Sequence, residues 1–301
     1  MQDPQKDLKT YFHFKRDSKL EIEVMQLPVS LANIPHLFTP HRTNFNHVFI
    51  FRTSDLVHHV DFIPIKVEPY SILFIGKGQV HQFDELQKYD GYELIFTDEF
   101  YNITEQDLKF LKNYLLFNGF WNKQNLQFDK KSLVKYLSLI ETIKAEIDFP
   151  GEMNKRIILK NLVQIFLLLI EREKLTDNAF VSSETRIPVF IHFMNLIEDE
   201  FKNNLSVSDY ARLLNITERK LGIITKENFG KLPNEIIIER QLIEAKRLLI
   251  HGELTVKEIG YELGFTDPTN FGKFFKKYTD LTPLAFKFQS ANKASLQKIT
   301  I

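Results

Sequence analysis

Residues 255–280, TVKEIGYELGFTDPTNFGKFFKKYTD, carry two short helical patterns with a turn between them. The first pattern places apolar or small residues at i, i+3, i+4 and i+7, which is one face of a helix; they are Val256, Ile259, Gly260 and Leu263. Gly264 follows, and glycine readily adopts the left-handed conformation that ends many helices. Asp267 is a helix-capping residue type, and Pro268 suits the first position of a new helix. The stretch therefore predicts helix, tight turn, helix.

The second pattern gives the new helix an aromatic face. Its members recur with helical spacing at Phe271, Phe274, Phe275 and Tyr278. The lysines of the same segment fall on its other faces; they are Lys273, Lys276 and Lys277. We expect the aromatic side chains to form core and the lysines to face outward.

The same plan occurs earlier in the chain. Residues 206–217, SVSDYARLLNIT, align with TVKEIGYELGFT at an offset of 49 residues. Ala211 corresponds to Gly260, and a small residue at this position lets a second helix cross closely. Asn215 corresponds to Gly264, and both residue types tolerate the left-handed conformation. Thr217 is predicted to cap the helix that follows.

Two such units in tandem indicate DNA binding, because the second helix of a helix-turn-helix enters the major groove. Two generic α-hairpins in an all-helical domain are the alternative. Residues 240–252, RQLIEAKRLLIHG, belong to a helix that starts near Pro233 and links the two units. About 16 residues of helix span roughly 24 Å, so the two second helices are expected about one DNA turn, ~34 Å, apart.

Residues 190–287 resemble the DNA-binding domain of the AraC/XylS family of bacterial transcription regulators. The resemblance is carried by LLNITERKL, NFGKLP, EAKRLL, VKEIGYELGF and NFGKFFKKYTDLTP, and it is most specific from Ala245 to Pro283. It implies an AraC-type DNA-binding domain over residues 189–290, followed by a tail at 291–301. It also implies sequence-specific binding to double-stranded DNA and contact with RNA polymerase.

The motif positions of the two recognition helices select candidate DNA contacts. They are Thr217, Arg219, Lys220, Ile223 and Lys226 in the first helix, and Thr269, Asn270, Lys273, Lys276 and Lys277 in the second. Family members often have polar or basic residues where this chain has Gly222 and Ile223, which shifts direct readout to Arg219. Arginine binds guanine with two hydrogen bonds, and Ile223 can contact a thymine methyl group. Lys276 and Lys277 are expected on phosphates, which position the protein without specifying sequence. For each lysine a plain solvated face is the alternative.

The first third of the chain reads as short strands. HVFIF, VDFIPIKV, SILFI and YELIF are rich in β-branched and aromatic residues and are separated by turn signals, which favours a sandwich or barrel. Residues 36–100 also resemble, through HRTNFNHVFIF and GKGQVHQF, the cupin-like sensor domain that many AraC/XylS members carry. This resemblance implies a β-barrel.

Helical periodicity follows over residues 107–116, 131–147 and 152–174. The third segment is apolar on more than one face. Packing against the barrel explains this pattern, and a dimer face is a second explanation compatible with the first. The resemblance implies that these helices are the dimerisation segment of a homodimer. The polar stretch LTDNAFVSSETRIP, residues 175–188, is interpreted as a linker, which leaves residues 1–174 as the cupin-like effector-sensing and dimerisation domain.

Histidines gather in the strand region at His41, His47, His58, His59 and His81. His81 falls where the second cupin motif has a metal ligand, but the H-x-H of the first motif is missing, so we expect no metal and no cofactor. His58 and His59 are adjacent and should point to opposite faces of a strand. The resemblance implies a barrel interior that holds a small-molecule effector; the candidate lining is His41, His47, Phe49, Phe51 and His81. A barrel filled by apolar side chains, serving only as a dimer scaffold, is the alternative.

The bulk composition fits two domains with substantial cores, at 301 residues and 44% hydrophobic content. Cysteine is absent, which excludes a disulfide framework and fits a reducing compartment. The N-terminal residues lack the apolar segment of a secretion signal, and the most apolar run, Ile165 to Ile170, is too short to cross a membrane. We therefore expect a cytoplasmic protein. The net charge is zero, with a small excess of Lys and Arg from Arg186 onward that permits a DNA-binding C-terminal half.

The expected fold class is α+β with two domains. An N-terminal cupin-like β-barrel with a helical dimerisation segment precedes a C-terminal all-α domain with two helix-turn-helix motifs. The expected function is a sequence-specific DNA-binding transcription regulator, an effector-responsive activator and not an enzyme. A metal-dependent cupin oxygenase fused to a DNA-binding domain, and an architectural DNA-binding protein without sensing, are the alternatives.

Overall fold

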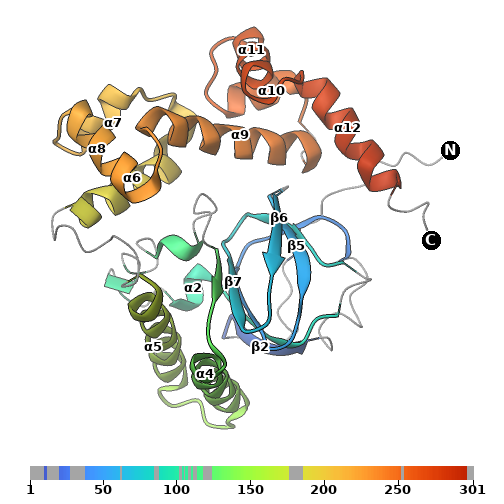
Figure 1. Ribbon diagram of the computed structural model, residues 1–301, viewed down its shortest axis with the longest axis vertical. Helices are drawn as coiled ribbons and strands as arrows, with labels where there is room; N and C mark the ends of the chain where they lie inside the picture. The colour runs from blue at the N-terminus through green and yellow to red at the C-terminus, as the bar shows by residue number, and fades with distance from the viewer. Residues whose placement is uncertain are drawn as a thin grey trace. The chain divides into compact units, whose positions relative to one another are not determined.

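The computed structural model describes residues 10–11, 20–27, 38–61, 63–84, 88–101, 104, 106–107, 110, 114–117, 124–175, 186–251 and 254–296. The chain divides into two compact units, with the boundary between Val181 and Ser182 (Figure 1). The N-terminal unit, from Lys9 to Val181, holds the strands and two long helices. The C-terminal unit, from Ser182 onward, has helices and no strands among its described residues.

The strands of the N-terminal unit form two five-stranded sheets. The order in the first sheet is β1 (Thr10–Tyr11), β3 (His41–Thr43), β8 (Val80–Gln82), β5 (Leu56–Val60) and β6 (Ile63–Val67). The order in the second sheet is β10 (Asn125–Gln127), β7 (Ser71–Ile75), β4 (Asn46–Phe51), β9 (Gly91–Phe96) and β2 (Ile22–Leu27). All neighbouring strands are antiparallel except β1 and β3.

The second sheet is buried on both faces, and β4 illustrates the reason. Its six residues are all buried, and side chains alternate along a strand. Phe49 and Phe51 point into the layer between the two sheets, where they pack with residues such as Leu56 of the first sheet. Val48 and Ile50 point the other way and join the core formed with the long helices. A strand buried on both faces reads as a continuous apolar run, as this one does.

The two sheets face each other as a sandwich, and the prediction of a closed barrel is not borne out by the strand pairing. Among the described strands, no hydrogen-bonded pairing joins one sheet to the other. On the edge strand β6, Ile63 is 52% exposed, as expected for a sheet edge that faces solvent. Short alternating strands fit a sandwich and a barrel equally well, because the two differ only in the pairing at the sheet edges.

Two long helices cover the outer face of the second sheet, together with the short elements α2 (Asp98–Tyr101) and η2 (Leu115–Phe117). Helix α4 (Lys130–Asp148) begins at Asp129, whose carboxylate accepts a hydrogen bond from the Ser132 amide at 2.7 Å. Helix α5 (Lys155–Leu175) packs beside α4. Both helices were predicted, whereas most of the helix predicted over residues 107–116 lies outside the described residues.

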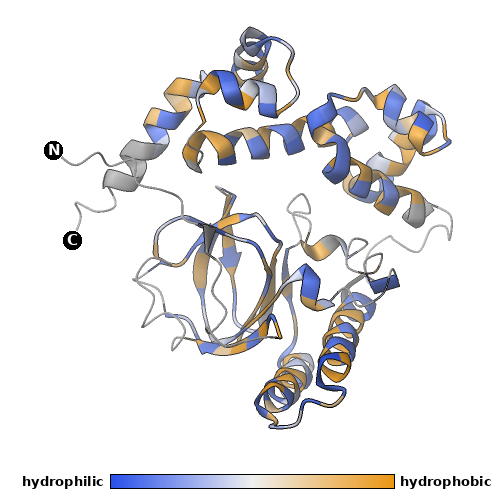
Figure 2. Cartoon of the chain, turned by 180° about the vertical axis from the view of Figure 1, so that it is seen from behind, coloured by the Kyte–Doolittle hydropathy of each residue, from blue (hydrophilic) through white to orange (hydrophobic). Residues whose placement is uncertain are grey.

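Helix α5 is rich in apolar residues (Figure 2), and they lie on two sides of the helix. Leu159, Val163 and Phe166 are fully buried against the N-terminal unit. A second row stays at least 40% exposed and consists of Ile157, Ile158, Ile165 and Leu168. Within the described part of the chain, no helix combines the length and the apolar character needed to cross a membrane.

The C-terminal unit contains seven α-helices and one 3-10 helix among its described residues. They are α6 (Arg186–Glu200), η4 (Phe201–Asn203), α7 (Val207–Leu213), α8 (Glu218–Phe229), α9 (Pro233–His251), α10 (Val256–Glu262), α11 (Pro268–Thr279) and α12 (Pro283–Leu296). Helix α6 includes residues 186–188 of the predicted linker, because proline is tolerated in the first turn of a helix. Helix α12 likewise continues past residue 290, into the predicted tail.

The internal repeat is present in the structure. Helices α7 and α10 both begin with a capping box, formed by Ser206 with Asp209 and by Thr255 with Glu258. After α7, Asn215 adopts a positive φ of 54°, and after α10, Gly264 adopts one of 81°. The predicted helix, sharp turn and helix are therefore confirmed in both copies.

The second turn is one residue longer than the first. Thr217 caps α8, whereas Asp267, and not its neighbour Thr266, caps α11. The first helices of the two units are thus 49 residues apart and the second helices 50 residues apart. The repeat continues beyond them, since α9 and α12 both start at a proline, Pro233 and Pro283.

Candidate nucleic-acid interface

Helix α8 turns one face into the C-terminal unit and leaves the other exposed. Leu221, Ile224 and Thr225 are buried. The predicted contacts Arg219, Lys220, Ile223 and Lys226 are exposed. The Thr217 hydroxyl, also predicted as a contact, accepts a hydrogen bond from the Lys220 amide at 3.2 Å and so fixes the start of the helix. The structure therefore brings the predicted residues of this helix onto one solvent-facing surface.

Helix α11 has the same arrangement with more positive charge. The predicted contacts Thr269, Asn270, Lys273, Lys276 and Lys277 are all exposed. Phe271 and Phe275 are fully buried, as predicted. The prediction that Tyr278 is core is wrong, because its ring packs on Phe274 but remains 40% exposed at the end of the helix.

The start of α11 carries a fixed negative charge. Asp267 accepts a hydrogen bond from the Thr269 amide at 2.8 Å. This hydrogen bond, helped by the positive charge of Lys273, lowers the pKa of the Asp267 carboxyl below its ordinary value. The carboxylate is therefore ionised at neutral pH and stabilises the positive end of the helix dipole.

Small residues let the helices of each unit cross closely, as the sequence predicted. A Cβ atom added at Gly260 of α10 would lie 3.3 Å from the Cβ atom of Phe271. Ala211, at the matched position of α7, is 3% exposed. Each recognition helix is consequently held directly against the first helix of its own unit.

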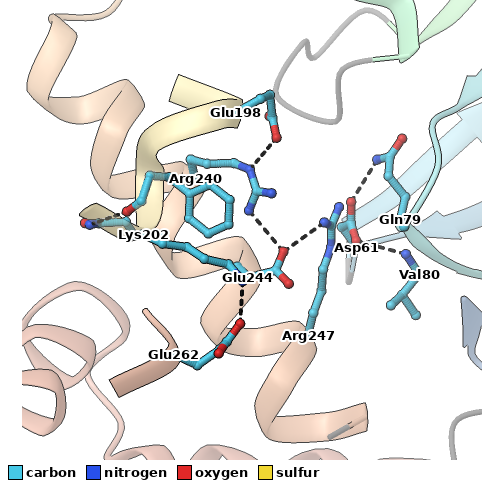
Figure 3. Close-up of polar contacts among 12 residues, drawn as sticks. Asp61, Gln79, Val80, Glu198, Lys202, Arg240, Glu244, Arg247 and Glu262 are labelled. Carbon is cyan, nitrogen blue, oxygen red and sulfur yellow. Dashed lines mark hydrogen bonds and ion pairs between the residues drawn. The ribbon is translucent and has the colours of Figure 1, made fainter. Parts of the chain in front are cut away.

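A buried ionic network holds the linking helix α9 to α6 (Figure 3). Arg240 donates hydrogen bonds to Glu198 at 2.9 Å and to Glu244 at 3.1 Å, and its guanidinium lies 3.8 Å from the centre of the Phe201 ring. Arg247 donates to the same Glu244 oxygen at 3.2 Å. Paired and hydrogen-bonded charges of this kind tolerate burial, whereas a lone charge would not.

The segment after α6 also contacts the second helix-turn-helix. Lys202 forms an ion pair with Glu262 of α10 (Figure 3). Asn204 donates a hydrogen bond to the Gly264 carbonyl. The Gly264 turn approaches so closely that an added Cβ atom would lie 1.7 Å from the Lys202 carbonyl oxygen. The second helix-turn-helix is therefore tied to the chain segment that leads into the first.

The candidate effector residues lie in the layer between the two sheets of the N-terminal unit. His41, His47 and His81 come from three strands, with ring centres of the first two 4.3 and 4.7 Å from that of His81. Phe49 stacks on Phe51 at 6.0 Å. All five predicted side chains are buried in this layer.

Sequence reasoning did not select two further residues of the layer. His58 is fully buried, and its Nε2 lies 3.3 Å from Nδ1 of His81, whereas His59 is exposed. Glu93 is buried and lies 2.7 Å from Nδ1 of His47. The signal for His58 was its position between Leu56 and Val60, two residues away on either side, which places all three on one face. We name His41, His47, His58 and His81 the histidine cluster.

Burial keeps part of the histidine cluster neutral. It lowers the pKa of His58 to about 3, with further contributions from the neighbouring imidazoles, first that of His41. The pKa of His81 is lowered for the same reasons. Nδ1 of His58 and Nε2 of His81 are buried and have no hydrogen-bond partner among the residues that the structure describes. Over the described residues, no group of three or more His, Asp or Glu side chains has an arrangement that could hold a metal ion.

The match to a known protein family falls in the C-terminal unit. Residues 210–289 match the model of a helix-turn-helix domain. The HTH-type transcriptional activator RhaS of Escherichia coli O6:H1 is 23% identical over 257 residues, which cover 82% of this chain and 86% of RhaS. The chain belongs to the AraC family of transcription regulators. It is a DNA-binding regulator, as expected.

Two further relatives of this AraC-family protein are similar over shorter stretches. The lactose operon transcription activator of Staphylococcus xylosus is 24% identical over 159 residues, and the match spans 53% of this chain and 56% of that relative. The solved C-terminal domain of the response regulator yesN from Fusobacterium nucleatum is 29% identical, with a TM-score of 0.32, and the match covers 33% of this chain and 98% of that domain. These relatives are named as regulators and not as enzymes.

Proposed function

We propose that this AraC-family protein is an effector-responsive activator that reads two successive major grooves of double-stranded DNA with α8 and α11. The observation that carries the proposal is the tandem arrangement: both units have a capping box, a left-handed turn residue and an exposed cationic second helix. Helix α9, with 19 residues, spans roughly 28 Å. Units at its two ends suit grooves about one helical turn, ~34 Å, apart.

Side-chain chemistry assigns roles within the two recognition helices. We assign guanine to Arg219 and a thymine methyl group to Ile223, since these are the partners that each side chain favours. Thr269, Asn270 and Lys273 at the start of α11 are assigned to base edges and the adjacent backbone. The remaining predicted contacts are assigned to phosphates, which set register and affinity; they are Thr217, Lys220, Lys226, Lys276 and Lys277.

The test is selection of genomic DNA fragments by the purified full-length protein at one stated salt concentration, because affinity without salt is uninterpretable. We expect one motif with two contact blocks about a helical turn apart. Arg219→Ala should relax the preference at one base pair by about 1–3 kcal/mol. Arg212→Ala, a matched change of an arginine with 76% side-chain exposure on α7, should leave that preference in place. Recovery of no motif, with binding that follows salt alone, would favour an architectural protein.

For the effector we propose the layer around the histidine cluster. The buried nitrogen atoms of His58 and His81 that lack partners would be satisfied by a small polar ligand, since buried polar groups normally have hydrogen bonds. Phe49 and Phe51 would supply apolar contact. Once the operator is known, small molecules can be screened for a change in DNA affinity. His81→Gln should abolish the change, whereas His59→Gln, on the exposed face of the same sheet, should not.

We propose the exposed row of α5 as the homodimer face. Ile157, Ile158, Ile165 and Leu168 lie on one side of the helix, and an exposed apolar patch of this kind marks an interaction surface. Ile165→Asp should convert a dimer to a monomer in light scattering after gel filtration. Ile63→Asp, an equally exposed residue on edge strand β6, should leave the mass unchanged.

Activation also requires a surface for RNA polymerase, and we propose α12. Leu284 and Phe288 lie four residues apart on this helix and are 56% and 65% exposed. Phe288→Ala should lower transcription from a reporter promoter without changing DNA affinity. An unchanged reporter signal would remove α12 from the proposal.

A further inference from the structure

Two glycines have no structural reason to be glycine. Gly222 lies inside α8 and Gly272 inside α11. A Cβ atom added at either position would meet no atom of the described residues within 4 Å, so packing against them does not exclude a side chain. Neither residue has a positive φ. Glycine is the least favoured residue in a helix interior apart from proline, so both helices are weakened with no gain inside the protein.

The other described glycines all have an explanation. Four have a positive φ that disfavours side chains: Gly78, Gly91, Gly230 and Gly264. At the remaining three an added Cβ atom would approach other atoms closely: 1.9 Å at Gly76, 2.6 Å at Gly151 and 3.3 Å at Gly260. Among the glycines that the structure describes, only Gly222 and Gly272 lack both reasons.

These two glycines occupy the same position of the repeat. They are 50 residues apart, as are the two recognition helices. Each follows the fully buried residue that anchors its helix, Leu221 or Phe271, and precedes an exposed residue, Ile223 or Lys273. Shared placement on the two exposed, cationic recognition helices indicates a shared function outside the chain.

We propose that Gly222 and Gly272 mark the points where each recognition helix approaches the base-pair edges of DNA too closely to admit a methyl group. The inference rests on the proposed function, in which α8 and α11 enter two major grooves. Glycine permits close approach of a backbone to a ligand. A helix seated this deeply reads the shape of the groove floor at a position where it offers no hydrogen-bonding side chain.

The neighbouring residues fit this arrangement. In α8, Arg219 and Lys226 lie one turn before and one turn after Gly222, on the same side of the helix. In α11, Thr269 and Lys276 have the same relation to Gly272. Polar side chains therefore flank each glycine along the helix and can reach bases and phosphates while the backbone between them contacts the groove.

The test compares Gly222→Ala and Gly272→Ala in the full-length protein, with two measurements on each variant. The midpoint temperature of thermal unfolding should rise by roughly 2–5 °C, because alanine favours the helix more than glycine does. Affinity for the selected operator should fall by at least about tenfold, while affinity for unrelated DNA changes less than about twofold, since phosphate contacts are kept. Gln289→Ala, an exposed neutral residue on α12, is the matched control and should change neither affinity.

Opposite movement of stability and specific affinity separates the proposal from simple damage to the fold. Variants that are stabilised and bind the operator as the natural sequence does would overturn the inference and leave the proposed function intact. Variants that lose operator binding together with thermal stability would also overturn it, because the methyl group would then act within the protein. A natural sequence that selects no operator would overturn both proposals.

Discussion

Gly264→Ala should be among the most destabilising single changes in the C-terminal unit. The residue has a φ of 81°, and its added Cβ atom would lie 1.7 Å from the carbonyl oxygen of Lys202. The left-handed conformation costs an alanine about 1–2 kcal/mol. The backbone of η4 cannot move away freely, because Lys202 is paired with Glu262 and Asn204 donates to Gly264 itself. We expect a total loss of at least about 3 kcal/mol in the free energy of unfolding.

Gly230→Ala isolates the contribution of the backbone conformation. Gly230 has a similar φ of 74° at the end of α8, but an added Cβ atom there would meet no atom of the described part of the chain within 4 Å. This variant should therefore lose only about 1–2 kcal/mol. The difference between the two variants measures the close approach of the Gly264 turn to η4.

The assay is urea unfolding, followed by circular dichroism for the helices and by tryptophan fluorescence. Trp121 is the single tryptophan and lies in the N-terminal unit, so its transition serves as an internal reference. The helical transition of the C-terminal unit should move to lower urea in both variants, and further in Gly264→Ala. Equal midpoints for the two variants would refute the reasoning, because the Lys202 carbonyl would then impose no constraint.

Three more predictions concern the core, the ionic network and the histidine cluster. Phe271→Ala should lower the free energy of unfolding in urea by about 3–5 kcal/mol, because the ring is fully buried. The exposed Lys276→Ala should change this free energy by less than about 0.5 kcal/mol. It should reduce the salt dependence of DNA binding by roughly one phosphate contact. Arg240→Ala should cost about 1.5–3 kcal/mol, because it removes charge-assisted hydrogen bonds to Glu198 and Glu244 while Arg247 still pairs with Glu244. A loss below about 1 kcal/mol would show that the network contributes little. The pKa of His58 is about 3 in the folded protein and 6.5 in the unfolded chain. Between these values the unfolded chain binds a proton that the folded protein does not. The free energy of unfolding should therefore be at its full value above pH 6.5 and should fall by about 1.4 kcal/mol per pH unit as the pH drops from 6.5 toward 3. Tryptophan-detected urea midpoints at pH 7.5 and 5.5 test this slope, which His58→Gln should reduce.

The C-terminal unit could be predicted from sequence almost completely. Its helices are short, and their boundaries are set by local chemistry. Thr217 and Asp267 cap where expected, and Ser206 and Thr255 cap the first helix of each unit. Local interactions of this kind are visible in a window of a few residues. The ionic network around Arg240 was not predicted, because it joins α6 to α9 across 42 residues of sequence.

The N-terminal unit shows where such prediction ends. Alternation placed His47, Phe49 and Phe51 on one face of β4, which the structure confirms. The pairing of strands could not be predicted from the sequence. Strand β4 lies between β7 and β9, and neither partner is adjacent to it in sequence. The burial of Glu93 beside His47 depends on that pairing, since their strands are neighbours only in space. The same limit explains why a sandwich and a barrel could not be separated.

The extra residue in the second turn has a consequence for promoters. The turn before α11 is longer than the turn before α8, and the two helices carry different side chains. The two helix-turn-helix units are therefore not interchangeable. A regulator that reads DNA with two different helix-turn-helix units binds an asymmetric site in one orientation. Reversing an operator in place would then preserve binding but present the opposite end of the protein to the transcription start site.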